Sequence, residues 1–220
     1  MKGKLSILIA VVTIFLVSYE MGGQTKSTDK KDFEAVKEEV ASTNYQDVRI
    51  KKLPIALQCW TFRKFTFFET MEKAKELGIK YLQPYPGQTF SPDMPGVKFD
   101  HNLDEDLIKL VKNKLNEYGL ALVSYGVVDF ENTEESMGKV FGFAKEMGIK
   151  TIVIEPESDD PSLLEQMVKK YDINIAIHNH PEPSKYFHPE TVLDYAQGID
   201  ERIGSCADTG PLDARWNQSC

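Results

Sequence analysis

The sequence predicts an α/β fold of repeated strand–helix units, a (β/α)8 TIM barrel of which about six units are present. Three observations favour it. Short apolar runs alternate with amphipathic helical stretches, the helical stretches begin with capping residues, and one helix–strand segment recurs two units later. Strict alternation of strands and helices is typical of a parallel sheet.

Six apolar runs have the length of strands. They span residues 55–59, 81–85, 121–126, 151–156, 174–180 and 203–209. Between them, apolar residues recur at the spacing of a helix face. The two clearest faces are Leu103, Leu107, Leu110, Val111 and Leu115, and Met137, Val140, Phe141, Ala144 and Met147.

The expected helix starts support this order of elements. Three pairs match or approximate a capping box, in which a polar side chain and a residue three positions later satisfy free backbone amides. These pairs are Thr66 with Glu69, Asn102 with Glu105, and Asn132 with Glu135. Asp160 followed by Pro161 predicts a fourth start, with proline at the first helical position.

An internal repeat favours a barrel over a doubly wound sheet. "AKELGIKYLQPYP" (residues 74–86) resembles "AKEMGIKTIVIEP" (residues 144–156), and each contains a glycine where a helix ends. Gly78 and Gly148 fit the left-handed position that follows a helix. The first strand–helix turn, "CWTFRKFTF", also lacks the glycine fingerprint of a dinucleotide-binding fold.

The chain has 220 residues and a formal charge of −8, which suits one sizeable domain and argues against a nucleic-acid partner. "MKGK" followed by the apolar run "LSILIAVVTIFLVSY" is typical of an export signal. We therefore predict a signal peptide at residues 1–23, a charged linker at 24–52, the partial barrel at 53–210 and a divergent tail at 211–220. The expected location is periplasmic, with no stable membrane span after cleavage. The alternative is an uncleaved inner-membrane anchor.

Three cysteines without a C-x-x-C pattern indicate neither a structural zinc site nor a redox motif. Cys59 and Cys206 fall in expected strands and are predicted to be buried free thiols.

Side-chain alternation along the strands predicts the candidate site. His178 and His180 share the face of Ala176, opposite two isoleucines that should pack under helices. The same alternation turns Glu155, Asp208 and Gln58 toward the barrel axis, at the strand ends where barrels carry active sites. Carboxylates and imidazoles that converge in an interior favour a divalent cation with oxygen and nitrogen ligands.

Each residue also has a simpler interpretation. Glu155 fits a salt-bridged rim residue, and Asp208 fits a cap of the turn that follows it. His178 alone fits a packed, hydrogen-bonded histidine, and His180 before Pro181 fits the end of a strand.

The long segment 86–103 fits a binding loop, in which Phe90, Tyr85 and Trp60 stack on a sugar ring. A surface loop with a small hairpin fits it equally well.

Several segments resemble one known family. "QCWTFRKF", "AKELGIKYLQPYPGQ", "GIKTIVIEP", "IAIHNHPEP" and "CADTG" are similar, in order and spacing, to the sugar phosphate isomerase/epimerase family of xylose isomerase-like TIM barrels. The resemblance covers about residues 53–210. It implies a metal-dependent isomerase or epimerase that moves a proton beside a carbonyl of a sugar or sugar derivative.

The resemblance also implies roles for individual residues. Glu155, Asp208 and His180 would hold a divalent cation, Mn, Mg, Co or Zn. Glu155 and His180 are the candidate catalytic residues, and the candidate substrate-binding residues are Gln58, His178 and Trp60. The expected partner is a small-molecule sugar, and assembly with a second copy of the chain is left open.

The chain departs from the family pattern in three places. Gln83 stands where the family often has glutamate, and Pro211 stands where a histidine usually follows "CADTG". Six strands are present where a barrel has eight, so we expect a chain truncated after the sixth strand, with poor stability alone or assembly with another chain. The alternative functions are a metal-dependent lyase or hydrolase of keto-glycosides and a non-catalytic sugar-binding remnant.

Overall fold

The computed structural model describes residues 49–50 and 53–210. Six parallel strands form the wall of a partial barrel in chain order: β3 (Ala56–Gln58), β4 (Tyr81–Gln83), β7 with β8 (Ala121–Leu122 and Ser124–Tyr125), β9 (Thr151–Ile154), β10 (Asn174–His178) and β11 (Ile203–Cys206). Parallel pairing joins β3–β4–β7 in one sheet and β8–β9–β10–β11 in a second. The predicted alternation of strands and helices is therefore confirmed.

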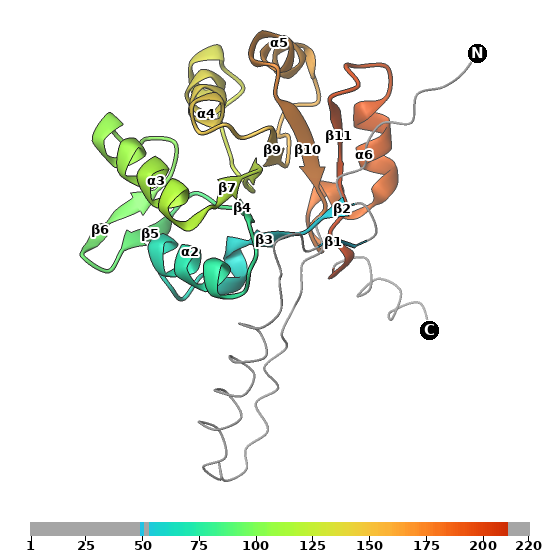
Figure 1. Ribbon diagram of the computed structural model, residues 1–220. Helices are drawn as coiled ribbons and strands as arrows, with labels where there is room; N and C mark the ends of the chain where they lie inside the picture. Colours follow the sequence, from blue (N-terminus) through green and yellow to red (C-terminus); the bar gives the residue numbers. More distant parts are fainter. Residues whose placement is uncertain (1–48, 51–52, 211–220) are drawn as a thin grey trace.

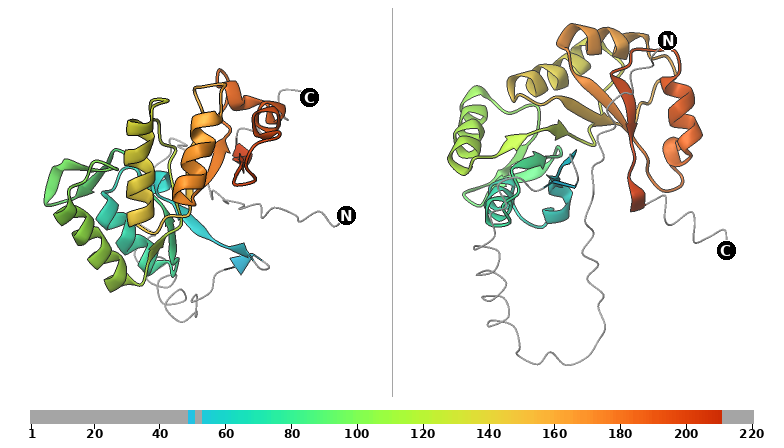
Figure 2. Two further views of the ribbon diagram at one scale, coloured as in Figure 1. Left: turned by 90° about the horizontal axis from the view of Figure 1, so that it is seen from above. Right: turned by 45° about the vertical axis from the view of Figure 1, so that its right-hand side comes forward.

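Within the described residues, five α-helices lie along the outer side of the strands (Figure 1). They are α2 (Phe67–Glu76), α3 (Glu105–Tyr118), α4 (Glu134–Glu146), α5 (Ser162–Tyr171) and α6 (Pro189–Ala196). Two short 3-10 helices, η1 (Cys59–Phe62) and η2 (Lys185–Phe187), follow β3 and β10. Figure 2 shows the same arc of helices around the strands from two further directions.

The core lies between the strands and this helical layer. On β9 and β10 the residues turned toward the helices are isoleucines, and they are almost fully buried. The set is Ile152, Ile154, Ile175 and Ile177. The opposite, inward face of β10 is only half-buried at Ala176 and His178. Burial of apolar area therefore fixes which face of each strand points inward.

Two antiparallel hairpins accompany the barrel. One pairs β1 (Arg49–Ile50) with β2 (Leu53–Pro54). The other pairs β5 (Gln88–Ser91) with β6 (Met94–Phe99) and packs on α2. The segment 86–103 is thus a hairpin, and Phe90 is fully buried against Phe68 with ring centroids 4.8 Å apart. The expectation that Phe90 stacks on a sugar was wrong, because its ring belongs to the core.

The helix ends follow local chemistry. Thr66 forms the predicted capping box with Glu69. The caps of α3 and α4 are Asp104 and Thr133, not Asn102 and Asn132. Pro161 occupies the cap position of α5, while the Asp160 carboxylate accepts the Ser162 amide at 3.0 Å.

Gly78 and Gly148 adopt the predicted left-handed conformation, with φ of 71° and 72°.

The two described cysteines are buried and free, as predicted. Cys206 lies in β11, whereas Cys59 begins η1 and does not belong to a strand. Burial raises the pKa of the Cys206 thiol to about 11 and also raises the pKa of Cys59. Both thiols therefore stay protonated and unreactive near neutral pH.

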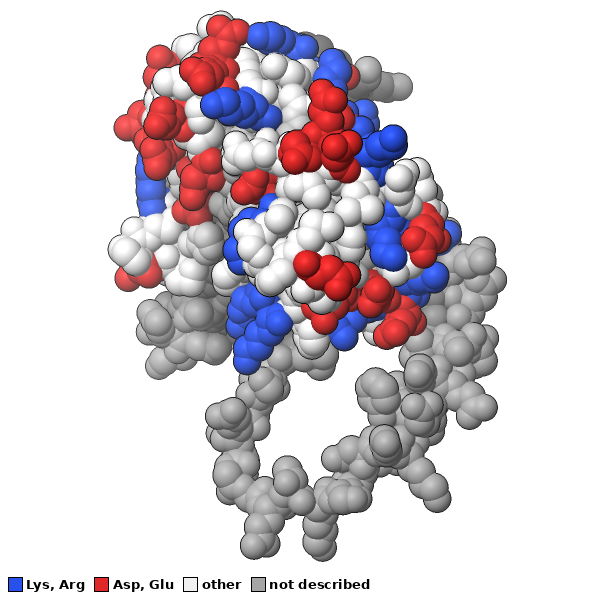
Figure 3. Space-filling model, turned by 90° about the vertical axis from the view of Figure 1, so that its left-hand side faces the viewer, with Lys and Arg blue, Asp and Glu red and all other residues white. Residues whose placement is uncertain are grey.

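The outer surface on the side of α3 carries acidic and basic residues side by side (Figure 3). Ion pairs such as Lys112–Glu146 and Lys139–Glu135 link neighbouring positions of the helical layer.

No helix in the described part of the chain combines the length and the apolar character that a membrane span needs. The predicted signal peptide, nearly all of the linker and the tail at 211–220 lie outside the described residues.

Candidate functional site

β9 delivers Glu155 to the inner side of the barrel. The strand ends at Ile154, and the next side chain alternates back to the face opposite the buried Ile152 and Ile154. The Glu155 carboxylate is 22% exposed. Its Oε2 accepts a hydrogen bond from Ser184 Oγ at 2.7 Å, and its Oε1 contacts His180 Nδ1. Glu155 is thus held by two groups from the segment after β10.

β10 delivers both histidines to the same face, as alternation predicted. Their ring centroids are 4.4 Å apart. The strand ends at His178, so His180 extends beyond it and is 47% exposed, against 13% for the His178 side chain. His178 Nδ1 is buried and has no hydrogen-bond partner in the described part of the chain. A buried imidazole nitrogen without a partner is available to a ligand.

β11 places Asp208 beside His178. Asp208 Oδ2 lies 3.6 Å from His178 Nε2, and Oδ1 accepts the Gly210 amide at 2.8 Å. The neighbouring His178 imidazole and, to a smaller extent, the hydrogen bond from the Gly210 amide lower the pKa of Asp208, although its partial burial opposes them. Asp208 therefore caps the following turn and orients a histidine at the same time.

Asn179 fixes the spacing between β10 and the segment after β11. Its Nδ2 donates to the Asp208 carbonyl at 2.9 Å, and its Oδ1 accepts the Asp208 amide at 2.7 Å. Asn179 is 5% exposed and points away from the barrel axis. Sequence reasoning missed both Asn179 and Ser184. A polar residue between two site histidines was the signal for Asn179, while nothing in "PEPSK" singles out Ser184.

Glu155, His178 and His180 form a group that could hold a metal ion. Each offers one ligand atom, and these atoms all lie within 4.8 Å of one another. Two nitrogens and a carboxylate oxygen suit a borderline cation such as zinc, and they leave positions open for a substrate. His178, expected from the sequence to contact substrate, lies in this group, and Asp208, expected to hold the metal, lies behind His178.

Gln58 is the last residue of β3, and Trp60 follows it in η1. Gln58 Oε1 accepts the Trp60 amide at 2.8 Å, and Gln58 Nε2 donates to the Gly126 carbonyl at 3.4 Å. Trp60 is 52% exposed and meets Tyr85 edge-on with ring centroids 5.0 Å apart. The structure joins these residues to each other rather than to Glu155.

Gly126 connects the two sheets where the third barrel strand ends. Its amide donates to the Pro84 carbonyl at 2.9 Å, and its φ is 141°. A Cβ at this position would lie 2.2 Å from the Val153 carbonyl oxygen. Only glycine therefore allows this close approach of the backbone to β9.

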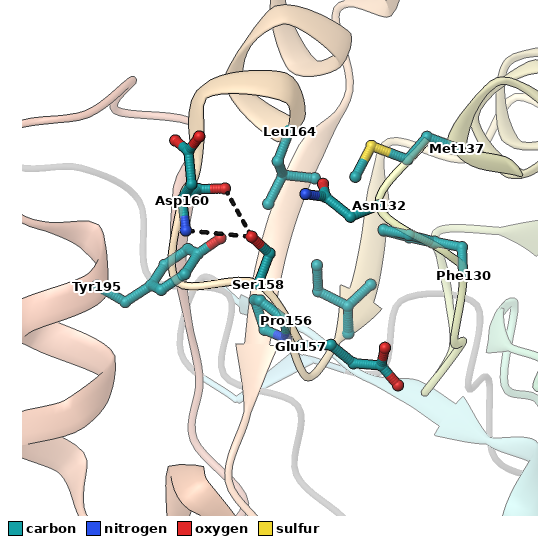
Figure 4. Close-up of a pocket in the computed structure, with 10 residues that line it drawn as sticks. Phe130, Asn132, Met137, Pro156, Glu157, Ser158, Asp160, Leu164 and Tyr195 are labelled. Atoms are coloured by element: carbon teal, nitrogen blue, oxygen red, sulfur yellow. Dashed lines mark hydrogen bonds between the residues drawn. The ribbon is translucent and has the colours of Figure 1, made fainter. Parts of the chain in front are cut away.

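A small hollow lies near the start of α5, and its walls include residues on either side of Glu155 in sequence (Figure 4). Its walls come from the segments after β8 and β9 and from α4, α5 and α6. They comprise Phe130, Asn132, Met137, Ile154, Pro156, Glu157, Ser158, Asp160, Leu164 and Tyr195. Figure 4 shows the Tyr195 hydroxyl turned toward the hydrogen-bonded pair Ser158 and Asp160. None of these wall residues is a candidate site residue.

No family model and no curated protein matches this chain. Among solved structures, a putative uncharacterized protein from Parabacteroides distasonis ATCC 8503 is 29% identical with a TM-score of 0.63, covering 76% of this chain and 70% of that one. The IolI protein, solved with a bound zinc atom, is 13% identical with a TM-score of 0.54, covering 74% of this chain and 65% of that one.

A sugar phosphate isomerase/epimerase from Parabacteroides distasonis also matches, at 16% identity and a TM-score of 0.45, covering 73% of this chain and 68% of that one. The chain spans about two thirds of the length of these proteins. The two matches with a TM-score above 0.5 share their fold with this chain. The described residues form part of a (β/α)8 barrel, with six of its strands in chain order.

Proposed function

We propose that this chain is a metal-dependent isomerase or epimerase that acts on a sugar or sugar derivative by proton transfer beside a carbonyl. One observation carries the proposal: Glu155, His178 and His180 converge within 4.8 Å at the strand ends where barrel enzymes bind substrate. The resemblance of the surrounding motifs to the isomerase/epimerase family supports the reaction class.

The residues present fit a divalent cation. His178 turns Nε2 toward Asp208 and leaves the buried Nδ1 without a hydrogen-bond partner among the described groups. A carboxylate behind a histidine is the usual arrangement around a metal ligand, because it fixes the orientation of the ring. When bound, the cation would stabilise negative charge on the carbonyl oxygen as the neighbouring proton leaves.

The chain's own groups would hold the substrate and move the proton. Ser184 fixes one oxygen of Glu155 and so orients the other toward His180. His180 is the more exposed imidazole and would hold the cation on the side open to substrate. We assign proton transfer to the Glu155 oxygen that does not hold the cation, and the exposed face of Trp60 to stacking on the sugar ring.

Calorimetric titration with Mn²⁺ tests the metal site. Glu155→Gln removes a ligand charge while keeping the shape, so we expect the affinity to fall by about 100-fold or more, and Asp208→Asn to weaken it by about tenfold. Glu157→Gln is the matched control, because Glu157 lies two residues away and outside the group. Unchanged affinity in both Glu155→Gln and Asp208→Asn would rule out this site.

Product analysis tests the reaction. Incubation with free ketoses should give the isomer or epimer, with solvent hydrogen incorporated beside the carbonyl. Cleavage of keto-glycosides without isomerisation would instead support a lyase or hydrolase. A chain that binds sugar, does not bind Mn²⁺ and does not convert the sugar would support a non-catalytic binding remnant.

We also propose that the chain is exported, because a basic start is followed by an apolar run within residues 1–23. N-terminal sequencing of the mature protein should find a new terminus near residue 23. An intact Met1 would favour the membrane-anchored alternative.

A further inference from the structure

Two glutamine side chains lie next to each other at the ends of the first two barrel strands. Gln58 on β3 and Gln83 on β4 are register partners in the parallel ladder. The Nε2 atom of each lies 3.4 Å from the same acceptor, the Gly126 carbonyl oxygen. Both contacts are at the long end of hydrogen-bond distances, so neither amide is firmly held by this oxygen.

Gln83 has hydrogen-bonding capacity that the described residues do not use. Its side chain is only 2% exposed, and its Oε1 has no partner in the part of the chain that the structure describes. Gln58, in contrast, commits its Oε1 to the Trp60 amide at 2.8 Å. A carboxamide carries two donor hydrogens and an acceptor oxygen, and buried groups of this kind nearly always have partners.

The third barrel strand, β7 with β8, separates β4, which carries Gln83, from β9, which leads to Glu155. Gly126, which both amides contact, approaches the Val153 carbonyl so closely that a Cβ would not fit. Val153 lies on the inward face of β9, two residues before Glu155. A ligand that reaches from Glu155 across the end of the third strand would therefore meet Gln83, whose Oε1 has no partner among the described residues.

We propose that Gln83 is a substrate-binding residue that accepts a hydrogen bond from a hydroxyl group of the ligand through Oε1. The second amide hydrogen of Gln83 or of Gln58 donates to the same or the neighbouring hydroxyl. The pair would thus recognise adjacent hydroxyl groups of a sugar or polyol without a charge. The choice of a sugar as ligand rests on the proposed function.

A buried water molecule would also satisfy Gln83 Oε1, and in that case the side chain would serve only stability. The two roles differ in what substitution does. Gln83→Met keeps the length of the side chain and removes the polar atoms. If Gln83 binds ligand, this change lowers polyol affinity and leaves the melting temperature unchanged or higher, because an unpaired buried group is removed.

Gln88 offers a matched control. It is 1% exposed and its Oε1 also lacks a partner in the described residues, but its Nε2 donates to the Phe65 carbonyl at 3.1 Å and to Thr70 Oγ1 at 3.0 Å. Gln88 therefore ties β5 to α2, away from the strand ends. We expect Gln88→Met to lower the melting temperature and to leave polyol affinity unchanged.

The test uses xylitol, which presents adjacent hydroxyl groups without a reactive carbonyl. Ligand-observed NMR titration of the full chain with xylitol gives the affinity, and a parallel Mn²⁺ titration reports on the Glu155 group. We expect Gln83→Met to weaken xylitol binding by about tenfold and to leave Mn²⁺ affinity unchanged. If this variant does not fold, Gln83→Asn replaces it, since it withdraws the amide by one methylene and should weaken binding similarly.

Three results would overturn the inference: no xylitol binding by the wild type at millimolar concentration, equal affinity in Gln83→Met, or an equal loss in Gln88→Met. Binding of xylitol that depends on Gln83 in a chain that holds no Mn²⁺ would support the inference and contradict the proposed metal-dependent function. The two failures are therefore distinguishable.

Discussion

The two sheets of the partial barrel carry different side chains at the carboxyl ends of their strands. β3 and β4 end in the uncharged carboxamides Gln58 and Gln83. β9 and the two strands after it end in Glu155, the two histidines and Asp208. One sheet therefore ends in uncharged hydrogen-bonding groups, and the other ends in ionisable groups.

Burial separates Gln83 from the ionisable set, whereas Gln58 is half-buried like Glu155. Gln83 is 2% exposed, which a neutral amide tolerates. The side chains of Glu155, Asp208 and His178 are 22%, 17% and 13% exposed, and each has a charged or polar partner from a neighbouring segment. This pairing offsets the loss of water around the ionisable groups.

Gly126→Ala should have the largest effect, because it breaks the junction between the two sheets. The added Cβ would lie 2.2 Å from the Val153 carbonyl oxygen, at a φ of 141° that alanine rarely adopts. We expect a loss of about 4 kcal/mol or failure to fold, measured by urea denaturation followed by circular dichroism.

Gly142→Ala is the control for that change. Gly142 lies within α4, and a Cβ there has nothing within 4 Å. Alanine should stabilise the helix by up to about 1 kcal/mol. Equal stability of the two variants would show that the close approach at Gly126 does not hold the sheets together.

Gln83→Glu tests whether the first sheet must stay uncharged. Burial would raise the pKa of the new carboxyl above its value in the unfolded chain. The folded state then binds the proton more tightly, so stability is kept at low pH and lost as the pH rises through and above the unfolded value. In metal-free protein we expect a loss of about 2 kcal/mol relative to wild type between pH 4 and pH 8.

Urea denaturation at pH 4, 6 and 8 measures this change, with Gln83→Met as the control that adds no titrating group. A constant difference between Gln83→Glu and wild type at all three values would contradict the expected cost of charge in this sheet.

The helix caps over the two sheets should differ in strength. Over the first sheet, the Thr66 side chain accepts the Glu69 amide at 3.2 Å while Glu69 accepts the Thr66 amide at 2.8 Å. Over the second, the Thr133 side chain accepts the Ser136 amide at 3.2 Å, and the cap has no reciprocal bond of the kind that Glu69 makes. We expect Thr66→Ala to cost about 1.5 kcal/mol and Thr133→Ala about 0.5–1 kcal/mol. Thermal melts measure both, and a larger loss in Thr133→Ala would reverse the ranking.

The periodic features of the fold could be predicted from the sequence. Alternation on β10 placed Ile175 and Ile177 under the helices and His178 on the inner face, because one buried face specifies the register of a strand. The junction at Gly126 could not, because it depends on Val153, which is distant in sequence. The α3 cap was misplaced because the Asn102 amide instead donates to Asp100 Oδ1 at 2.7 Å, so a turn precedes the helix.

The candidate site was only partly predictable for the same reason. Alternation turned Glu155, His178 and His180 toward the same side of the sheet, but their grouping depends on where the segment after β10 folds back. Ser184 donates to Glu155 from 29 residues away, and no local pattern reports that contact.

The smallest expected effect concerns charges at the opposite end of the second sheet, where β11 begins. The Asp200 carboxylate accepts hydrogen bonds from Arg202 Nε at 2.8 Å and Nη2 at 2.9 Å, and this pairing lowers the pKa of Asp200 to about 2. The folded state thus binds this proton less tightly than the unfolded chain. The stabilisation is present above about pH 4 and is lost as the pH falls toward 2.

Water screens this pair, so we expect Asp200→Asn to cost at most about 1 kcal/mol at pH 7 and to match wild type near pH 2. Asp172→Asn is the control, since Asp172 makes one bond to Arg202, is 86% exposed, and asparagine tolerates its φ of 56°. Denaturation curves across pH 2–7 measure both variants. A loss in Asp200→Asn that persists at pH 2 would mean that packing, not charge, holds this end of the sheet, because a protonated Asp200 no longer differs from asparagine in charge.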